Sequence, residues 1–462
     1  MIAPPDPTVS DPPEPGPTPP DAAPPDPDSA PVRRKPSLGL RVRLGVLWAL
    51  QWGVTGALLT YLPLYFEGRG LSRGQLGSLF AVAAVGLWVA PIVVGQLCDR
   101  LMGAEKYLAV AHFFGGLTLL VVPFAANLFS VTGEGFWFLI ASVGLFSALY
   151  FPTLPVVSAV TFRHLPDPDT QFGRVRLWGT VGWVLAGLFV SVWLGQREAM
   201  EWLSRNAPAM RDRLTHLDSL LRRLAPVDDA DCFRIAAVLS FALSSFCAWL
   251  PRSPPPKPTS GRFAPLQTLG LLKDRQFALL IAASFALSLI VPVYTLEVPA
   301  LLVREGYSKD WVPAVMTIGQ LSEFPALLLL GLCLKRLGVT MTFTLGVAAW
   351  AMRFLILAVT EATGPVLAGL ALHGVCHVFL IVAVQLYVDA KCPPDLRASA
   401  QNLFAVVTVG VGMPLGFLIS GTLSEWASGG TETPSRLLFL AAAIAVSAVL
   451  VPVWMVGRRE RV

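Results

Sequence analysis

The sequence predicts an all-α polytopic membrane protein with about twelve transmembrane helices. Of its 462 residues, 54% are hydrophobic and only 14% are charged, whereas ordinary soluble domains carry roughly 25% charged residues. The apolar residues gather in runs close to the ~20 residues that cross a bilayer core. No long run alternates at a period of two, so helices rather than a barrel would satisfy the backbone hydrogen bonds.

The predicted spans follow one another through mostly short connections. They cover approximately residues 42–66, 74–98, 106–127, 135–160, 172–196, 232–250, 276–303, 310–334, 338–360, 364–390, 397–424 and 436–457. A longer linker over residues 251–275 divides the spans six and six. We therefore expect a six-helix half over 39–250 and a second over 276–462.

The N-terminal region differs sharply from the spans. Residues 1–36 hold 14 of the 39 prolines, mixed with Asp and Glu and almost without large apolar side chains. This composition predicts a disordered tail over 1–38, because such a chain has too little apolar surface to bury. It contains no basic start followed by an apolar core, so we expect the first span to act as its own insertion signal.

The distribution of Lys and Arg predicts the orientation. With loops assigned alternately to two sides, the side of the N-terminus collects 22 basic residues and the other side 11, six of them in the loop 197–231. Positively charged loops remain in the cytoplasm, so both termini are expected there, with the protein in the plasma (inner) membrane. The net charge of +5 is explained by these loops, and nucleic acid is not an expected partner.

The loop 197–231 carries an apolar stripe at helical spacing. Its members alternate steps of four and three residues: Met210, Leu214, Leu217, Leu221 and Leu224. The remaining positions are rich in Arg and Asp, so the segment is typical of an amphipathic helix on the extracytoplasmic surface. A plain extension between two spans is the simpler interpretation.

The six cysteines are scattered singly, and no cluster has metal-ligand spacing, so neither metal nor cofactor is expected.

Two motifs resemble a known superfamily. Twelve spans, a central linker and "GQLCDRLMGAEK" after the second span, with Asp99 and Arg100, resemble the major facilitator superfamily. A related phrase, "GLCLKRLG" at 331–338, follows the second span of the other half and suggests an internal duplication. The resemblance implies the major facilitator fold, a gating role for Asp99 and Arg100, and two halves moving around a site at the midplane.

A narrower resemblance covers about residues 42–457. The phrases "RVRLWGTVGW", "IGQLSEFPALLLLG" and "PPDLRASAQNLF" together are similar to the nucleoside:proton symporter family. The resemblance implies substrate contacts on the fifth, eighth and tenth spans. It also implies an acidic residue directly after His377, where this chain has Val378. That departure weakens any direct transfer of the coupling mechanism.

Three residues of the fifth span share one helical face. Arg176, Thr180 and Trp183 lie at i, i+4 and i+7, which aligns a cation, a hydroxyl and an aromatic ring in one column. Such a column suits a planar polar ligand, because the ring stacks and the guanidinium donates directional hydrogen bonds. The resemblance implies substrate contacts at these three positions. Arg174 is interpreted as a positive anchor at the membrane surface.

Polar residues also occur inside the eighth and tenth spans. Gln320 and Glu323 are three residues apart and lie on one face; a carboxylate within a span is costly unless it is paired or faces water. The resemblance gives both a substrate-binding role, while a static ion pair with Arg176 or Arg353 is the alternative. His373 and His377 also share a face, and histidine titrates near neutral pH. Glu323 or His377 is expected to carry the coupled proton.

The seventh span matches the family less well. Tyr294 and Thr295 are the nearest candidates for its polar contacts, and Glu297 is a further buried acid. Arg353 is interpreted as structural. Gln51 and Trp52 of the first span are candidates to line a cavity, and His112 is assigned no role because no polar companion aligns with it.

These observations predict a secondary transporter for proton-coupled nucleoside uptake that works as a monomer. The expected substrate-binding residues are Arg176, Thr180, Trp183, Thr295, Gln320, Glu323, His373 and His377. A carrier of another small solute, such as a sugar, a metabolite or an exported drug, is the nearest alternative, and a membrane sensor or scaffold is a more distant one. An enzyme is not expected, since no nucleophile-and-base pairing or phosphate-cradling loop occurs.

Overall fold

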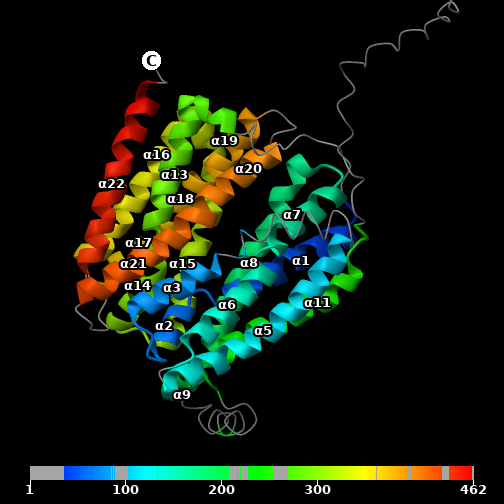
Figure 1. Ribbon diagram of the computed structural model, residues 1–462, viewed down its shortest axis with the longest axis vertical. Helices are drawn as coiled ribbons and strands as arrows, with labels where there is room; N and C mark the ends of the chain where they lie inside the picture. Colours follow the sequence, from blue (N-terminus) through cyan, green and yellow to red (C-terminus); the bar gives the residue numbers. More distant parts are fainter. Residues whose placement is uncertain are drawn as a thin grey trace, which may run out of the picture. The chain divides into compact units, whose positions relative to one another are not determined.

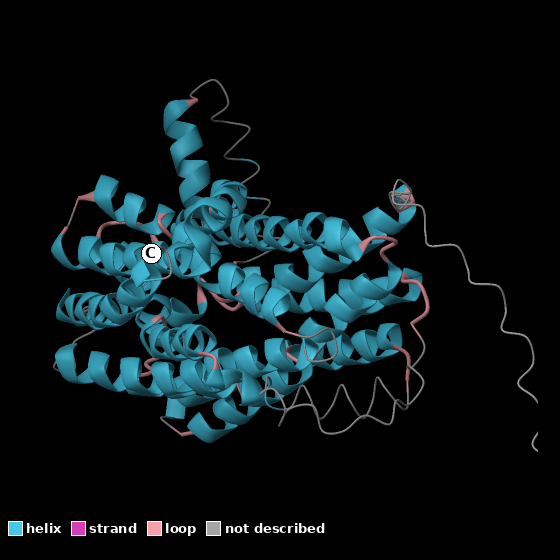
Figure 2. Ribbon diagram, turned by 90° about the horizontal axis from the view of Figure 1, so that it is seen from above, coloured by secondary structure: helices cyan, strands magenta, loops and turns pink. Residues whose placement is uncertain are grey.

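The computed structural model describes the chain after its N-terminal tail as a bundle of helices. The described residues are 36–84, 86, 88, 102–132, 134–207, 216, 219, 227–253, 269–360, 362–392, 397–428 and 436–459. Within these ranges every regular element is a helix and no strand occurs (Figure 2). The all-α membrane class is therefore confirmed.

The helices form two sets along the sequence. The N-terminal set comprises α1 (Leu38–Gly56), α2 (Leu62–Glu67), α3 (Arg73–Ala83), α5 (Ala104–Thr132), α6 (Phe136–Tyr150), α7 (Thr153–His164), α8 (Pro168–Leu194), α9 (Gln196–Asn206), α11 (Asp231–Phe246) and η3 (Cys247–Trp249). The C-terminal set comprises η4 (Leu269–Lys273), α13 (Arg275–Ile290), α14 (Pro292–Arg304), η5 (Lys309–Trp311), α15 (Val312–Leu321), α16 (Glu323–Val359), α17 (Thr363–Ala371), α18 (His373–His377), η6 (Val378–Val382), α19 (Ala383–Lys391), α20 (Arg397–Ala405), η7 (Val406–Gly412), α21 (Met413–Ser428) and α22 (Arg436–Arg459). Figure 1 shows most of each set together, with α2 and α3 of the N-terminal set lying beside α14 and α21 of the C-terminal set.

The described helices agree with the predicted spans in position. Nine helical runs in the described residues are long and apolar enough to cross a membrane. One of them, Lys309–Val359, covers two predicted spans, which meet at Gly338, where φ is +76° inside α16. The first predicted span corresponds to α1 and α2, and the second begins in α3 and continues outside the described residues. The count of twelve stays a prediction for that reason.

Several sequence-based expectations fall outside the described residues. These are the tail 1–35, the gating residues Asp99 and Arg100, the linker residues 254–268, and the apolar stripe of the loop 197–231 (Met210, Leu214, Leu217, Leu221 and Leu224). The loop does begin with a described helix, α9. The phrase "GLCLKRLG" lies in α16 and ends at Gly338, the residue that separates the two parts of that helix.

Close backbone contacts hold the helices of each set together. The clearest case lies between α1 and α8, where a Cβ on Gly182 would stand 2.0 Å from the carbonyl oxygen of Ala49. Only a glycine permits this approach, as is common where membrane helices pack on small residues. One apolar cluster fills the interior of the C-terminal set and two fill the N-terminal set. The larger N-terminal cluster also includes Leu296 of α14 and Phe417 of α21, so it continues across the contact between the sets.

The two sets contact each other at one end of the bundle. Here α3 packs against α21, α2 against α14, and α8 against α15 and η5 (Figure 1). We call this the distal end; it contains the C-terminal ends of α8, α14 and α21 and the start of α3, and it is the side that the charge distribution predicts to be extracytoplasmic. Arg73 of α3 lies 2.6 Å from Glu67 and 3.6 Å from Glu297 of α14. The Glu297 side chain is fully buried and accepts a hydrogen bond from Ser424 of α21.

Candidate functional site

The site is built where two helical spans of the C-terminal set are interrupted next to each other. The eighth span breaks at Ser322, between α15 and α16, and the tenth breaks at Leu372, between α17 and α18. The Gly374 N–H donates to the Ser322 hydroxyl over 2.8 Å, so the break on one helix satisfies a backbone group on the other. A Cβ on Gly374 would stand 2.0 Å from the Ser322 carbonyl oxygen. These contacts fix Glu323 and His373, which follow the two breaks, opposite each other.

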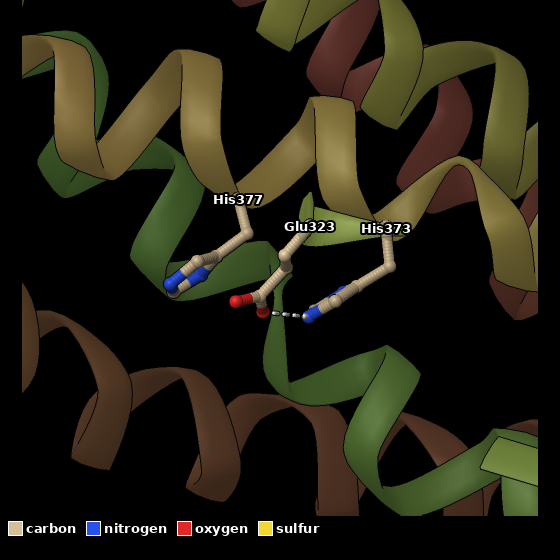
Figure 3. A group of neighbouring side chains, drawn as sticks. All are labelled: Glu323, His373 and His377. Atoms are coloured by element: carbon tan, nitrogen blue, oxygen red, sulfur yellow. Dashed lines mark ion pairs between the residues drawn. The ribbon is translucent and has the colours of Figure 1, made fainter. Parts of the chain in front are cut away.

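Glu323, His373 and His377 form a cluster of titratable side chains (Figure 3). His373 Nε2 lies 3.6 Å from Glu323 Oε1. The two imidazole rings stack with centroids 5.6 Å apart and an angle of 17° between their planes. One nitrogen or oxygen atom from each of the three residues lies within 4.8 Å of the others. The structure thus brings together the acid and the two histidines, all of which the sequence singled out.

Two further residues extend this cluster into the interior of the C-terminal set. Arg353 of α16 is fully buried, and its Nη1 lies 3.0 Å from His373 Nδ1. Its guanidinium carbon stands 3.5 Å from the centroid of the Tyr294 ring. The Tyr294 ring in turn stacks on His373, with centroids 6.2 Å apart and planes at 20°. Arg353 therefore contacts a histidine rather than the acid that the sequence analysis had considered.

Residues near the cluster add one charge and one unsatisfied acceptor. Arg176 of α8 lies close enough to Glu323 for the opposite charges to interact, so this pair joins the two helix sets. Gln320, on the last turn of α15, has a buried Oε1 with no hydrogen-bond partner in the described part of the chain. Since buried polar atoms are normally paired, an amide oxygen left open beside the cluster suits a ligand donor.

The predicted column on the fifth span lies on a continuous helix. α8 runs unbroken through Arg176, Thr180 and Trp183, so the three residues do share a face, and all three are half-buried. The Trp183 ring lies against Trp52 of α1, with centroids 6.1 Å apart. Arg176 is the member of the column for which an interaction with the cluster is described.

The seventh span contributes differently from expectation. Thr295 is half-buried on α14, but one residue along a helix turns the side chain by about 100°, and it is Tyr294 that stacks on His373. The sequence analysis missed the role of Tyr294 and Arg353 as a stacked pair. The sequence feature that indicates this contact is Arg353 itself, because a charged residue within an apolar run marks a functional position.

The first span and His112 form a separate network in the N-terminal set. Gln51 is fully buried; its amide Nε2 donates to Thr153 over 2.8 Å, and its Oε1 lies 3.0 Å from His112 Nε2. His112 Nδ1 lies 3.0 Å from the Ser240 hydroxyl. The sequence analysis found no polar companion aligned with His112 on its own helix; the structure supplies its partners from other helices, α1 and α11. Gln51 is committed to this network and is not exposed to a cavity.

The charges around the cluster disfavour a bound cation. Two nitrogens and a carboxylate oxygen at these separations are compatible in geometry with a shared divalent ion. However, the buried Arg353 guanidinium points at His373 Nδ1, and Arg176 adds a second positive charge beside Glu323. The arrangement is better suited to a neutral ligand that donates hydrogen bonds to Glu323 and Gln320 and stacks on aromatic rings.

Comparison with known proteins adds independent information. The chain is 29% identical over 398 residues to the putative nucleoside transporter YegT of Escherichia coli (strain K12), covering 83% of this chain and 84% of that protein. It is 26% identical over 414 residues to the nucleoside permease NupG of the same organism, covering 84% and 88%. The crystal structure of the nucleoside transporter NupG superposes with a TM-score of 0.71 at 22% identity, covering 90% of this chain and 98% of that one.

The superposition with a solved transporter confirms the major facilitator fold, with its two sets of helices. The family model described as "MFS_1 like family" matches residues 41–433. This match covers most of the sequence and extends over both helix sets, apart from the first residues of α1 and the last helix, α22. The chain therefore belongs to the MFS_1 like family and is a multi-pass membrane protein of the major facilitator superfamily.

Proposed function

We propose that this protein imports nucleosides together with protons by alternating access. The observation that carries the proposal is the half-buried cluster of Glu323, His373 and His377 on the eighth and tenth spans, in which Glu323 lies three residues after Gln320 with its unsatisfied Oε1. Polar and titratable groups are retained inside a membrane where they meet a solute or a proton. Two relatives that align along most of the chain are a nucleoside permease and a putative nucleoside transporter, which supports a nucleoside as the solute.

The substrate lies between the two helix sets, with contacts from both. Trp183 stacks on the planar base, and Arg176 and Thr180 offer donors on the same face of α8. From the C-terminal set, Gln320 and Glu323 accept hydrogen bonds from base or ribose groups, because the Gln320 oxygen is open and the Glu323 carboxylate only accepts when charged. His373, His377 and Thr295 close the site.

The proton binds at Glu323 or His377. Glu323 is held between His373 and the positive charge of Arg176, and Arg176 belongs to the other helix set. Movement of the sets changes the distance between Arg176 and Glu323, and with it the preference of Glu323 for the charged form. Protonation and the inward turn of the loaded carrier are coupled in this way.

Alternating access requires that contacts between the two helix sets form at one end of the bundle while those at the other end break. Arg73 and Glu297 make such a contact at the distal end, and α3 packs against α21 beside it. Asp99 and Arg100 are assigned to the opposite gate. The protein acts as a monomer in the plasma (inner) membrane with both termini in the cytoplasm.

A carrier of a different solute is the second candidate. The family resemblance implies an acidic residue directly after His377, but this chain has Val378 at that position. The rings of His373 and His377 stack on each other. A histidine pair offers hydrogen bonds to hydroxyl groups, so a sugar or another small metabolite fits this part of the site. Competition of nucleoside uptake by a panel of unlabelled sugars and nucleosides separates the two candidates.

The decisive experiment is uptake of labelled uridine and adenosine by cells that express the protein, with and without a protonophore. We expect uptake that the protonophore suppresses and that Glu323→Gln abolishes. Glu198→Gln, the same change on the exposed helix α9, serves as the matched control and is expected to leave uptake unchanged. If correctly inserted protein takes up neither uridine nor adenosine, the proposal that it transports nucleosides is contradicted.

A further inference from the structure

Arg353 is the most deeply buried charged side chain near the cluster, and its environment is unusual. It is 0% exposed, and its Nε and Nη2 atoms have no hydrogen-bond partner in the part of the chain that the structure describes. A buried charge is normally paired with an opposite charge. Arg353 instead lies over the Tyr294 and Trp350 rings, at 3.5 and 5.1 Å from their centroids, and directs Nη1 to His373. Packing against two rings lowers the cost of burial but does not explain why an arginine is kept here.

The contact between Arg353 and His373 fixes the protonation state of the imidazole. An arginine is always protonated and only donates hydrogen bonds, so at 3.0 Å from Nη1 the His373 Nδ1 must offer its lone pair. A neutral imidazole carries its hydrogen on one nitrogen only. The hydrogen of His373 is therefore on Nε2, the atom that faces Glu323 Oε1 over 3.6 Å.

We propose that Arg353 is a positioning residue that holds His373 neutral, with its hydrogen on Nε2 and directed at Glu323. The inference rests on the proposed function only where it concerns transport. Adding a proton to Nδ1 would place two N–H donors and two positive charges 3.0 Å apart. His373 is consequently not the carrier of the coupled proton, and its task is to direct the positive end of its Nε2–H bond at the charged form of Glu323, at an N···O separation of 3.6 Å that is longer than a hydrogen bond.

The groups that face His373 are consistent with this assignment. They come from four helices: Arg353 and Glu323 of α16, His377 of α18, Tyr294 of α14, and Arg176 of α8 through Glu323. Glu323 is the acid among these groups, and it lies on the Nε2 side. The cation Arg353 lies on the Nδ1 side. The field of these charges therefore favours a ring with its hydrogen toward Glu323.

The test is the ¹⁵N NMR spectrum of the histidines in the intact protein, reconstituted in lipid bilayers. The chain has five histidines, and the spectrum of His373→Gln identifies the signals of His373. In the unmodified protein we expect Nδ1 without hydrogen and Nε2 with hydrogen throughout the range of about pH 5 to 8, in which a free histidine would titrate. A signal from hydrogen on Nδ1, or a charged ring within this range, overturns the proposal.

Two variants sharpen the result. In Arg353→Met the donor is lost, and we expect His373 to titrate within the same range. In Arg353→Lys a charged donor remains, and the Nε2–H form is expected to be restored. Arg43→Met removes an exposed arginine of α1 and should leave the His373 signals unchanged. His373 signals in Arg353→Met that match those of the unmodified protein would show that Arg353 does not set the tautomer.

The measurement separates the inference from the proposed function. The spectrum needs no transported solute, so a protein that fails to transport nucleosides still tests the tautomer of His373. Where uptake is found, Arg353→Met is expected to change the pH dependence of uptake between about pH 5 and 8, because His373 then gains and loses a proton of its own in addition to the coupled one. An uptake profile unchanged by Arg353→Met would contradict the assigned role.

Discussion

Two histidines inside the bundle, the buried His112 of the N-terminal set and the half-buried His373 of the C-terminal set, have opposite surroundings. The polar partners of His112 in the described ranges are neutral: its ring nitrogens lie 3.0 Å from Gln51 Oε1 and 3.0 Å from the Ser240 hydroxyl. His373 lies between a cation and an anion, Arg353 and Glu323. Both side chains are polar residues in an apolar bundle. The difference lies in the charge of their neighbours.

The two networks also differ in how completely they are satisfied. Around His112, the Gln51 amide donates to Thr153, and the Gln51 carbonyl oxygen accepts from the Tyr150 hydroxyl over 2.6 Å. A closed network of this kind rigidifies the N-terminal set. Around His373, by contrast, atoms of Gln320 and Arg353 have no hydrogen-bond partner in the described part of the chain. We infer that the network around His112 has a structural role. The network around His373, which is charged and has unsatisfied atoms, is where we infer that ligand and proton bind.

The largest expected effect comes from replacing each histidine by leucine. His373→Leu leaves the buried Arg353 without its acceptor, and an unpaired charged donor of this kind costs about 3 kcal/mol. His112→Leu removes two neutral hydrogen bonds, each worth about 0.6 kcal/mol in a membrane. We expect His373→Leu to lower the thermal unfolding temperature in detergent more strongly and to abolish uptake, whereas His112→Leu keeps uptake per folded molecule. Equal losses of uptake would remove the distinction between the two networks.

The comparison also shows what the sequence could predict. Apolar runs, short connections and charged loops predict the all-α membrane class, because each depends on local composition. Glu323, His373 and His377 stand out as polar residues within apolar runs, and the spacing of four between the histidines places them on one face. The cluster itself depends on the adjacent breaks at Ser322 and Leu372, which no local pattern specifies.

Partners from distant helices were harder to predict. His112 meets Gln51 and Ser240, which are 61 and 128 residues away along the chain, so no alignment within its own helix reveals them. From the sequence, Arg353 is interpreted as a structural residue that could neutralise an acid inside the bundle. Its contact with His373 depends on the packing of α16 against α18. Sequence periodicity identifies the face of a helix but not what lies opposite.

An intermediate effect is expected from adding a methyl group beside each network. At Gly374 the new Cβ would stand 2.0 Å from the Ser322 carbonyl oxygen, whereas at Gly116 it would stand 2.6 Å from the Phe241 ring. A side-chain ring can move aside more readily than backbone, so Gly374→Ala should lie at the upper end of the usual overpacking cost of about 1–3 kcal/mol and Gly116→Ala at the lower end.

The two glycine variants also differ in their expected effect on function. Gly374→Ala displaces Glu323 from His373 and should raise the KM for nucleoside, which Gly116→Ala should leave unchanged. Thermal unfolding and the concentration dependence of uptake measure both effects. A raised KM in Gly116→Ala would indicate that the His112 network also shapes the site.

The smallest effect is expected at Asp274. Its exposed ion pair provides a reference against which the stability effects in the two buried networks are compared. Asp274 caps α13 by accepting the Phe277 N–H over 2.9 Å and lies 2.9 Å from Lys391 Nζ. The Phe277 hydrogen bond, and then Lys391, hold the pKa of Asp274 below its usual value. Because the pKa is lower in the folded state, the stabilisation is present above the unfolded value of about 3.9 and is lost as the pH falls through the folded one.

Asp274→Asn keeps a capping side chain but removes the charge, so it should cost less than about 1 kcal/mol at neutral pH. Unfolding temperatures of the variant and the unmodified protein should approach each other as the pH falls below about 3.9, because Asp274 gains its proton first in the unfolded state and only at lower pH in the folded state. Salt should reduce the difference at neutral pH, because exposed charges are screened. The effect of His373→Leu should resist salt, since Arg353 is buried. If salt weakened both effects equally, the charges around His373 would have to be reached by water, and the contrast between an exposed ion pair and a buried site would fail.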